Sequence, residues 1–321
     1  MKTFDEIYEE LQNVDTTELN SAWKAAKKKD EKANKIARII CLIVDILAII
    51  IFFENSEKYD WILSLIPIIM IALGIVIINL FIVAIISVFY SGKEKNIYNE
   101  KYKKIVIKKL MKNFYDNLEY FPNKEMPEYI YEKLQYEFYD IYESEDYMEA
   151  EINNKYSIQM AEVLTQKEEE YEDSEGESHT REITLFHGLF AKIVMHKSIK
   201  GELKIMQNGT FLLDKRLKMD SSEFEKYFDV KASNQIMGMQ ILTADVMEEL
   251  VDFENKTKMK FDIYIKENEL YLRFHSEDMF EPTNFKRGPL DRNLIRKYFY
   301  MLNFTYNLSN ELIKLIDNIE I

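Results

Sequence analysis

The sequence predicts an α+β fold, in which N-terminal helices and a two-helix transmembrane hairpin precede a cytoplasmic domain of antiparallel sheet packed with helices. Two apolar runs at 36–53 and 61–90 predict the hairpin, because a span needs roughly 20 apolar residues and the second run holds thirty without a charge. Alternating apolar residues after position 146 predict the strands, and apolar residues at helical spacing predict the helices around them.

Four segments follow one another along the chain. Residues 1–35 are expected to form two cytoplasmic helices, the second capped by Asp15. Residues 36–90 form the hairpin, with spans at about 36–53 and 61–90, and residues 91–145 form a basic neck with docking helices. Residues 146–321 form the α+β domain. Residues 1–110 carry +2 of the net −14, so residues 111–321 carry −16 and would repel the phosphates of nucleic acid.

Asp45 interrupts the first span without preventing its insertion. Twelve Ile, Leu, Val and Phe residues between 39 and 53 each favour insertion by roughly 0.3–0.6 kcal/mol, against about 2.5–3.5 kcal/mol for one central Asp. Counted from the outer loop, Asp45 is expected opposite Ile69 and Met70, while Asn79 is expected near the level of Arg38. Asp45 then carries a proton, reaches toward Arg38, or meets another chain. We hypothesise that it contributes to self-association or to a partner membrane protein.

The charges that flank the spans predict the orientation. Seven Lys or Arg lie at 24–38 and eight Lys at 93–112, whereas the loop 54–60 holds three acids and one Lys. The positive-inside rule therefore places both termini in the cytoplasm, with the chain in the cell membrane as a multi-pass protein. The neck lysines either set this topology alone or also contact anionic lipid. The lysines considered for lipid contact are Lys101, Lys103, Lys104, Lys108 and Lys109.

Two helices are expected between the hairpin and the sheet. The first covers 101–118, before the helix-breaking Phe121-Pro122, and the second covers 127–141 with Pro127 in its first turn. The second helix is expected to dock on the domain core through four apolar residues. These are Ile130, Leu134, Phe138 and Ile141.

The rest of the chain predicts hairpins followed by helices. Strands at 147–152 and 155–166 flank an Asn153-Asn154 turn, and a strand at 182–196 has a bulge at Gly188. Seven acids at 168–177 predict a solvated hairpin tip, with a weak cation site as the alternative. A short strand is expected at 202–206. Helices are expected at 222–228, 243–254 and 290–316, and strands at 258–265 and 270–274.

The sequence contains no recognisable catalytic or metal-binding motif, and its 56 acidic residues are so numerous that pairs at catalytic spacing occur by chance. The single cysteine, Cys41, lies in the first span, and the histidines lack a zinc motif. His187 and His196 are nine residues apart, which puts them on opposite faces of an unbroken strand, whereas a bulge at Gly188 would return them to one face. The other histidines are His179 and His275. Glycine-rich phosphate loops and nucleophile elbows are also absent, so we expect no cofactor, no metal and no catalytic residue, and an enzyme is the less favoured class.

Three segments carry a resemblance to a known family. They are Phe186 to Phe190, residues 224–242 leading into Leu242-Thr243, and Phe280-Glu281-Pro282. Together they resemble a bacterial family described as a domain of unknown function, with the serial number three-one-three-seven. The resemblance covers roughly 100–320, and two spans before the domain fit it. The family has no established activity, so the resemblance implies architecture and leaves function open.

The sequence favours a membrane-anchored cytoplasmic binding, scaffold or sensor protein. Its expected partners are the lipid bilayer and either another protein or further copies of the chain, which meet through the hairpin. The alternative is a membrane-tethered enzyme that acts on lipid or peptide. A small transporter or channel would require oligomerisation, because two helices cannot enclose a path.

Overall fold

The computed structural model describes residues 1–55, 65–134, 137–172, 176–209, 216–276, 279–282, 285 and 287–318. They belong to two units that are described separately. One unit comprises Met1–Leu11, Val106–Glu281 and Arg292–Ile321, and contains the sheet. The other comprises Gln12–Ile105 and Pro282–Asp291, and contains two long helices.

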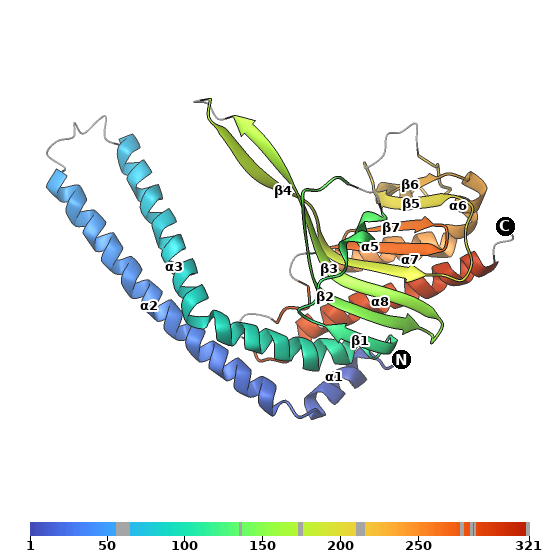
Figure 1. Ribbon diagram of the computed structural model, residues 1–321, viewed down its shortest axis with the longest axis horizontal. Coiled ribbons are helices and arrows are strands. Elements are labelled where there is room, and N and C mark those ends of the chain that lie inside the picture. The colour runs from blue at the N-terminus through green and yellow to red at the C-terminus, as the bar shows by residue number, and fades with distance from the viewer. Residues whose placement is uncertain are drawn as a thin grey trace. The chain divides into compact units, whose positions relative to one another are not determined.

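The helical unit pairs α2 (Thr17–Asn55) with α3 (Leu65–Tyr102), as Figure 1 shows. Asp15 caps α2 as predicted, because its Oδ1 accepts a hydrogen bond of 2.9 Å from the backbone N–H of Thr17. The helix then continues without a break through the first apolar run. Its alanines at 22, 26, 33 and 37 are buried, and such small side chains allow a neighbouring helix to approach closely.

Within the described residues, one helical stretch is long and apolar enough to cross a membrane. It lies in Ala72–Met111, and none of its apolar window is buried. Leu80 and Phe81, for example, are 65% and 66% exposed. The predicted second span, 61–90, overlaps this helix from Ala72 onward, and 61–64 lie outside the described residues. The predicted first span lies within α2 but is not a second such stretch, so two spans remain a prediction.

The other unit is built on an eight-stranded antiparallel sheet in the order β1-β2-β3-β4-β8-β7-β5-β6, which confirms the α+β class. Asn153 and Asn154 form the turn between β2 and β3 with φ of 57° and 51°, as the sequence predicted. The strands are β1 (Asp116–Phe121), β2 (Ile141–Ile152), β3 (Tyr156–Glu172), β4 (Ser178–Val194), β5 (Glu202–Gln207), β6 (Phe228–Ala232), β7 (Phe261–Lys266) and β8 (Glu269–His275).

Gly188 has a different role from the predicted bulge. Its φ is 152°, and a Cβ at this position would lie 1.9 Å from the carbonyl oxygen of Phe274, so β8 can approach β4 only where the side chain is absent. The register of β3 with β4 changes elsewhere, since Thr165 pairs with Phe186 while Gln166 pairs with Thr184. The bulge in β4 is therefore at position 185.

Helices cover one face of the sheet, where the main aromatic core lies. Phe261 of β7 and Phe274 of β8 contact Phe253 of α7 (Ala244–Thr257) and Phe304 of α8 (Arg292–Asn318). Thr243 caps α7, which confirms the helix predicted at 243–254, and α8 confirms the predicted C-terminal helix. The helix α1 (Phe4–Asn13) also belongs here, because Phe4 packs on Phe299 with ring centroids 5.6 Å apart.

The opposite face has a smaller core under α5 (Glu128–Glu132). Side chains alternate along a strand, so Tyr264 and Tyr271 point away from α7 and α8. They form a buried cluster with Tyr131 of α5 and with Phe186 and Phe190 of β4. Tyrosine is suited to this face, because its ring adds apolar area while its hydroxyl can still reach a polar partner.

The predicted neck helices are confirmed only in their first parts: residues 101–111 are helical, and Ile130 and Leu134 are buried in the core under α5. The helix expected at 101–118 continues from α3 through a π-helical turn η2 (Lys103–Ile107) and α4 (Lys108–Met111), but Asp116–Phe121 is strand β1. The helix expected at 127–141 ends at Glu132, Phe138 is 96% exposed, and Ile141 opens β2. Pairing with β2 and β3 overrides the local helical pattern in both places.

Smaller differences occur near the C-terminal half of the sheet. The helix predicted at 222–228 is only the turn η4 (Phe224–Lys226), and it leads directly into β6. Neither β6 nor α6 (Gln235–Ile241) was predicted. The strand predicted at 258–265 begins at Phe261, because α7 continues to Thr257 and ends in a left-handed Lys258.

Candidate functional site

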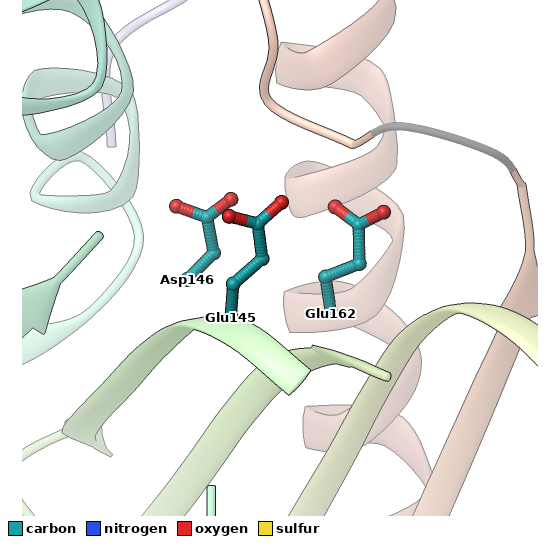
Figure 2. Close-up of side chains that lie close together, drawn as sticks. All are labelled: Glu145, Asp146 and Glu162. Atoms are coloured by element: carbon teal, nitrogen blue, oxygen red, sulfur yellow. The ribbon is translucent and has the colours of Figure 1, made fainter. Parts of the chain in front are cut away.

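Three carboxyl groups meet at an irregularity in β2. Glu145 and Asp146 of β2 and Glu162 of β3 each offer an oxygen atom within 4.8 Å of the others, and Figure 2 shows the three side chains together. Consecutive strand residues normally point to opposite faces. Here the register of β2 shifts after Glu145 and Asp146 has a φ of 57°, so both neighbours can reach the same place.

Protein groups already donate to this cluster. The hydroxyl of Tyr120 donates to Asp146, and the backbone N–H of Met279 donates to Glu162 Oε2 over 2.9 Å. His187 Nε2 lies 3.0 Å from Glu162 Oε1. Burial, and then the nearby Asp146 carboxylate, raise the pKa of Tyr120, so the phenol stays protonated and remains a donor.

These oxygens form the type of ligand set that hard divalent cations prefer. The donors from Tyr120, Met279 and His187 also satisfy carboxylates without an ion. The arrangement therefore fits a hydrogen-bonded polar centre as well as a cation site. The sequence did not predict it, since its cation alternative was placed at 168–177. The hairpin tip at 173–175 lies outside the described residues.

A second polar network is buried on the α5 face of the sheet. Arg273 Nη2 donates to Asp262 Oδ2 over 2.9 Å, and Nη1 donates to Glu137 Oε2 over 3.2 Å. His275 Nε2 lies 2.9 Å from the same Asp262 oxygen. Burial favours the neutral acid, but the bond to His275 and the charge of Arg273 outweigh it and hold the pKa of Asp262 below its ordinary value. The ion pair of Arg273 with Asp262 therefore lies inside the core.

The structure contradicts the predicted isolation of Asp45. Asn79 Nδ2 donates to Asp45 Oδ1 over 2.8 Å. The register explains the difference, because Lys95 of α3 pairs with Asp30 of α2 at 2.6 Å. Fifteen residues beyond Asp30 is Asp45, and sixteen before Lys95 is Asn79. Arg38 is exposed, and no hydrogen bond or ion pair joins it to Asp45 in the described part of the chain.

The neck lysines have different surroundings. Lys101 pairs with Glu18 at 2.9 Å, and Lys109 pairs with Glu10 at 3.0 Å. Lys104 pairs with Glu100 one turn away on α3, at the helical spacing of four residues. Lys103 is buried and Lys108 is partly exposed. Their proposed contact with anionic lipid stays a prediction.

His187 and His275 contact carboxylates, as described above. His196 lies against the ring of Tyr156, with centroids 4.8 Å apart, and His179 lies against Tyr171. The described residues hold no cluster of histidines around one point.

The fold and these sites define an α+β domain accompanied by an apolar helix that could anchor it to a membrane. Residues 184–314 match the family model described as "Protein of unknown function (DUF3137)", which confirms the resemblance seen at Phe186 to Phe190 and beyond. No curated protein matches the chain. The crystal structure of the mycobacterial trehalose monomycolate transport factor A, TtfA, is similar at a TM-score of 0.33 and 7% identity, covering 66% of this chain and 94% of that chain.

Proposed function

We propose that this protein is a membrane-anchored binding protein, whose hairpin crosses the cell membrane twice and whose α+β domain binds a protein partner in the cytoplasm. The observation that carries this proposal is the contrast between the two units. The apolar window within Ala72–Met111 has no buried residue, whereas the sheet unit has its own aromatic core. An apolar surface of this kind requires cover, and a bilayer provides it.

Charge supports the orientation. Lysines follow the second span, 61–90, while acids predominate in the 54–60 loop, as the positive-inside rule requires for cytoplasmic termini. The polar groups of the domain support binding rather than catalysis. Tyr120, Arg273 and His187 are engaged with buried carboxylates, which is the pattern of structural networks.

Membrane extraction tests the anchor. The full chain should stay in the membrane pellet after an alkaline carbonate wash, and only detergent should release it. A version in which Leu80 and Phe81 are replaced by Lys should shift to the soluble fraction, because each charge near the bilayer centre costs about 2.5–3.5 kcal/mol. Exposed Ile236 and Met239 of α6 provide a matched control, since their replacement by Lys should leave extraction unchanged.

Cysteine labelling tests the orientation. Because Cys41 is the single cysteine, a Cys41→Ser chain can carry one reporter at a time. A membrane-impermeant maleimide should label Ser56→Cys in intact cells and Asn96→Cys only after lysis. Labelling of Asn96→Cys in intact cells, or release of the chain by carbonate, would overturn the proposed topology.

A further inference from the structure

A furrow of about 770 Å³ lies between α7 and α8. Two further hollows, of about 550 and 460 Å³, adjoin α8 and share some of the residues that line the furrow. Tyr300 and Asn303 line both the 770 and 460 Å³ hollows, and Asn307 lines both the 770 and 550 Å³ hollows. The two smaller hollows also hold cations, Lys314 in one and Lys2 and Arg296 in the other, so the acidic site is the furrow between α7 and α8.

The two helices beside the largest hollow are antiparallel. Phe253 of α7 stacks on Phe304 of α8 with ring centroids 3.5 Å apart, and Glu249 lies within hydrogen-bonding reach of Glu311. Moving forward along α7 therefore means moving backward along α8. Both phenylalanines are buried, so their rings form an apolar floor beneath the furrow.

The α7 wall is strongly acidic. Four carboxylates line it within two turns of helix, and Lys256 is the one cation that lines the hollow with them. Lys256 already pairs with Asp252 at 2.7 Å, so a net negative charge remains. The four are Asp245, Glu248, Glu249 and Asp252.

The α8 wall is different, because it presents amides. Asn303 and Asn307 are half-buried and lie one turn apart. Their side chains make no hydrogen bond to another described residue, so each offers both a donor and an acceptor to the furrow. Paired donors and acceptors of this kind match the backbone groups of an extended peptide, whereas a helix satisfies its own backbone groups.

We propose that the furrow binds an extended, lysine- or arginine-rich segment of a partner protein, with the peptide backbone on the α8 amides and the basic side chains on the α7 acids. This inference rests on the proposal that the domain is a binding module. From Asp245 to Thr257 the α7 wall rises about 18 Å at ~1.5 Å per residue, which an extended segment spans with about five or six residues at ~3.3 Å each.

Charge decides between possible occupants. Acidic or phosphorylated segments would be repelled by the α7 wall, and a single ion would leave the amides and the length of the furrow unused. Glu249 gives a further reason for a cation. Burial and the adjacent Glu311 carboxyl group raise the pKa of Glu249 to about 7, so this pair tends to hold a proton that an ammonium group could replace.

Fluorescence anisotropy with the full chain in lipid nanodiscs tests the proposal. The probe is a labelled peptide of about six residues that alternates Lys and Ala, and a peptide of alternating Glu and Ala is the negative probe. The variant Glu248→Gln/Asp252→Asn should bind the basic peptide about five- to tenfold more weakly, because two favourable ion pairs are lost. Glu168→Gln/Glu170→Gln removes the same charge from an exposed part of β3 and should bind within about twofold of the original chain.

The amides give a second, charge-independent readout. Asn303→Ala/Asn307→Ala should weaken the basic peptide while leaving the slope of affinity against salt unchanged, since the ion pairs remain. Equal weakening by the α7 and β3 variants would show general attraction to an acidic protein and overturn the furrow as a site. Absence of binding to the basic peptide would also overturn it. Carbonate-resistant membrane attachment, measured on the same preparation, separates either failure from failure of the proposed anchor.

Discussion

Replacing Glu249 by Gln should stabilise the sheet unit near pH 8 and have little effect near pH 4. Glu249 of α7 is partly buried and faces Glu311 of α8, and burial followed by this second carboxyl group raises its pKa from 4.5 to about 7. The folded chain therefore holds the proton more tightly than the unfolded chain. Its contribution to stability is lost as the pH rises from about 4.5 through about 7, and glutamine, which stays neutral, avoids that loss.

The size of the effect follows from the same shift. A rise from 4.5 to about 7 corresponds to a ceiling of about 3 kcal/mol at ~1.36 kcal/mol per pH unit. Glu249 is only partly buried, so solvent screening reduces the expected gain to about 1 kcal/mol. For a domain of this size that gain corresponds to about 2–4 °C in Tm near pH 8.

Tyrosine circular dichroism during heating of the full chain in detergent measures this gain between pH 4 and pH 8. Glu311→Gln should give a smaller gain with the same pH dependence, because it removes the close pair but leaves Glu249 partly buried, and the double variant should add little to Glu249→Gln. Glu248→Gln is the matched control, since this neighbour is exposed. Equal stabilisation by Glu249→Gln at both pH values would refute the argument, as would the same pH-dependent gain in the control.

Four further changes test other parts of the structure. Arg273→Met should destabilise the sheet unit by about 3–5 kcal/mol in urea unfolding, because buried carboxylates lose their cation; a loss under about 1 kcal/mol would contradict the buried network. Gly188→Ala should lower the free energy of unfolding by more than about 3 kcal/mol, because its Cβ would meet a β8 carbonyl. Gly209→Ala should lower it far less, because the space around Gly209 is open and only its φ of 94° is strained by a side chain. Asn79→Leu should lower the free energy of unfolding of the hairpin by about 0.6–1.7 kcal/mol, followed by helicity in detergent titrations, and in an Asp45→Leu background it should have no such effect. Gln in place of the five neck lysines should reduce binding of a soluble short-chain anionic lipid to the full chain, by about 1 kcal/mol per lipid-facing lysine, and unchanged binding would leave these lysines as topology signals only.

Helix ends and turns could be predicted from the sequence where the signal is local. Thr243 and Asp15 cap their helices because their side chains reach backbone N–H groups within three residues. Asn153 and Asn154 accept a left-handed backbone more readily than most residues, so the β2–β3 turn could also be predicted.

Segment 112–141 could not be predicted in the same way. Its apolar spacing is helical, yet residue 118 lies in β1 and Ile141 opens β2. Strand pairing with residues more than twenty positions away decides these elements, as in the contact of Tyr120 with Met148. A periodic pattern contains no information about such partners.

The carboxylate cluster depends on a similar distant register. Glu162 meets Glu145 directly across β2 and β3, which any correct hairpin register would give. Asp146 joins them only because its backbone is left-handed at the irregularity in β2. An acidic Glu-Asp pair inside a strand was the one available signal, and in a chain with 56 acidic residues it does not stand out.

The hairpin shows how one wrong register changes a functional hypothesis. The hypothesis of self-association through Asp45 depends on the absence of a partner at the same depth in the hairpin. That absence follows only if the two helices leave the outer loop at the same level. The observed register gives Asp45 the partner Asn79 instead, so the carboxyl group no longer requires a second chain. The polar group left over is Asn79 Oδ1, which is buried and has no hydrogen-bond donor among the described residues. If two hairpins self-associate through polar contacts, a donor of one chain would therefore bind the amide oxygen of Asn79 in the other, rather than a basic group binding Asp45.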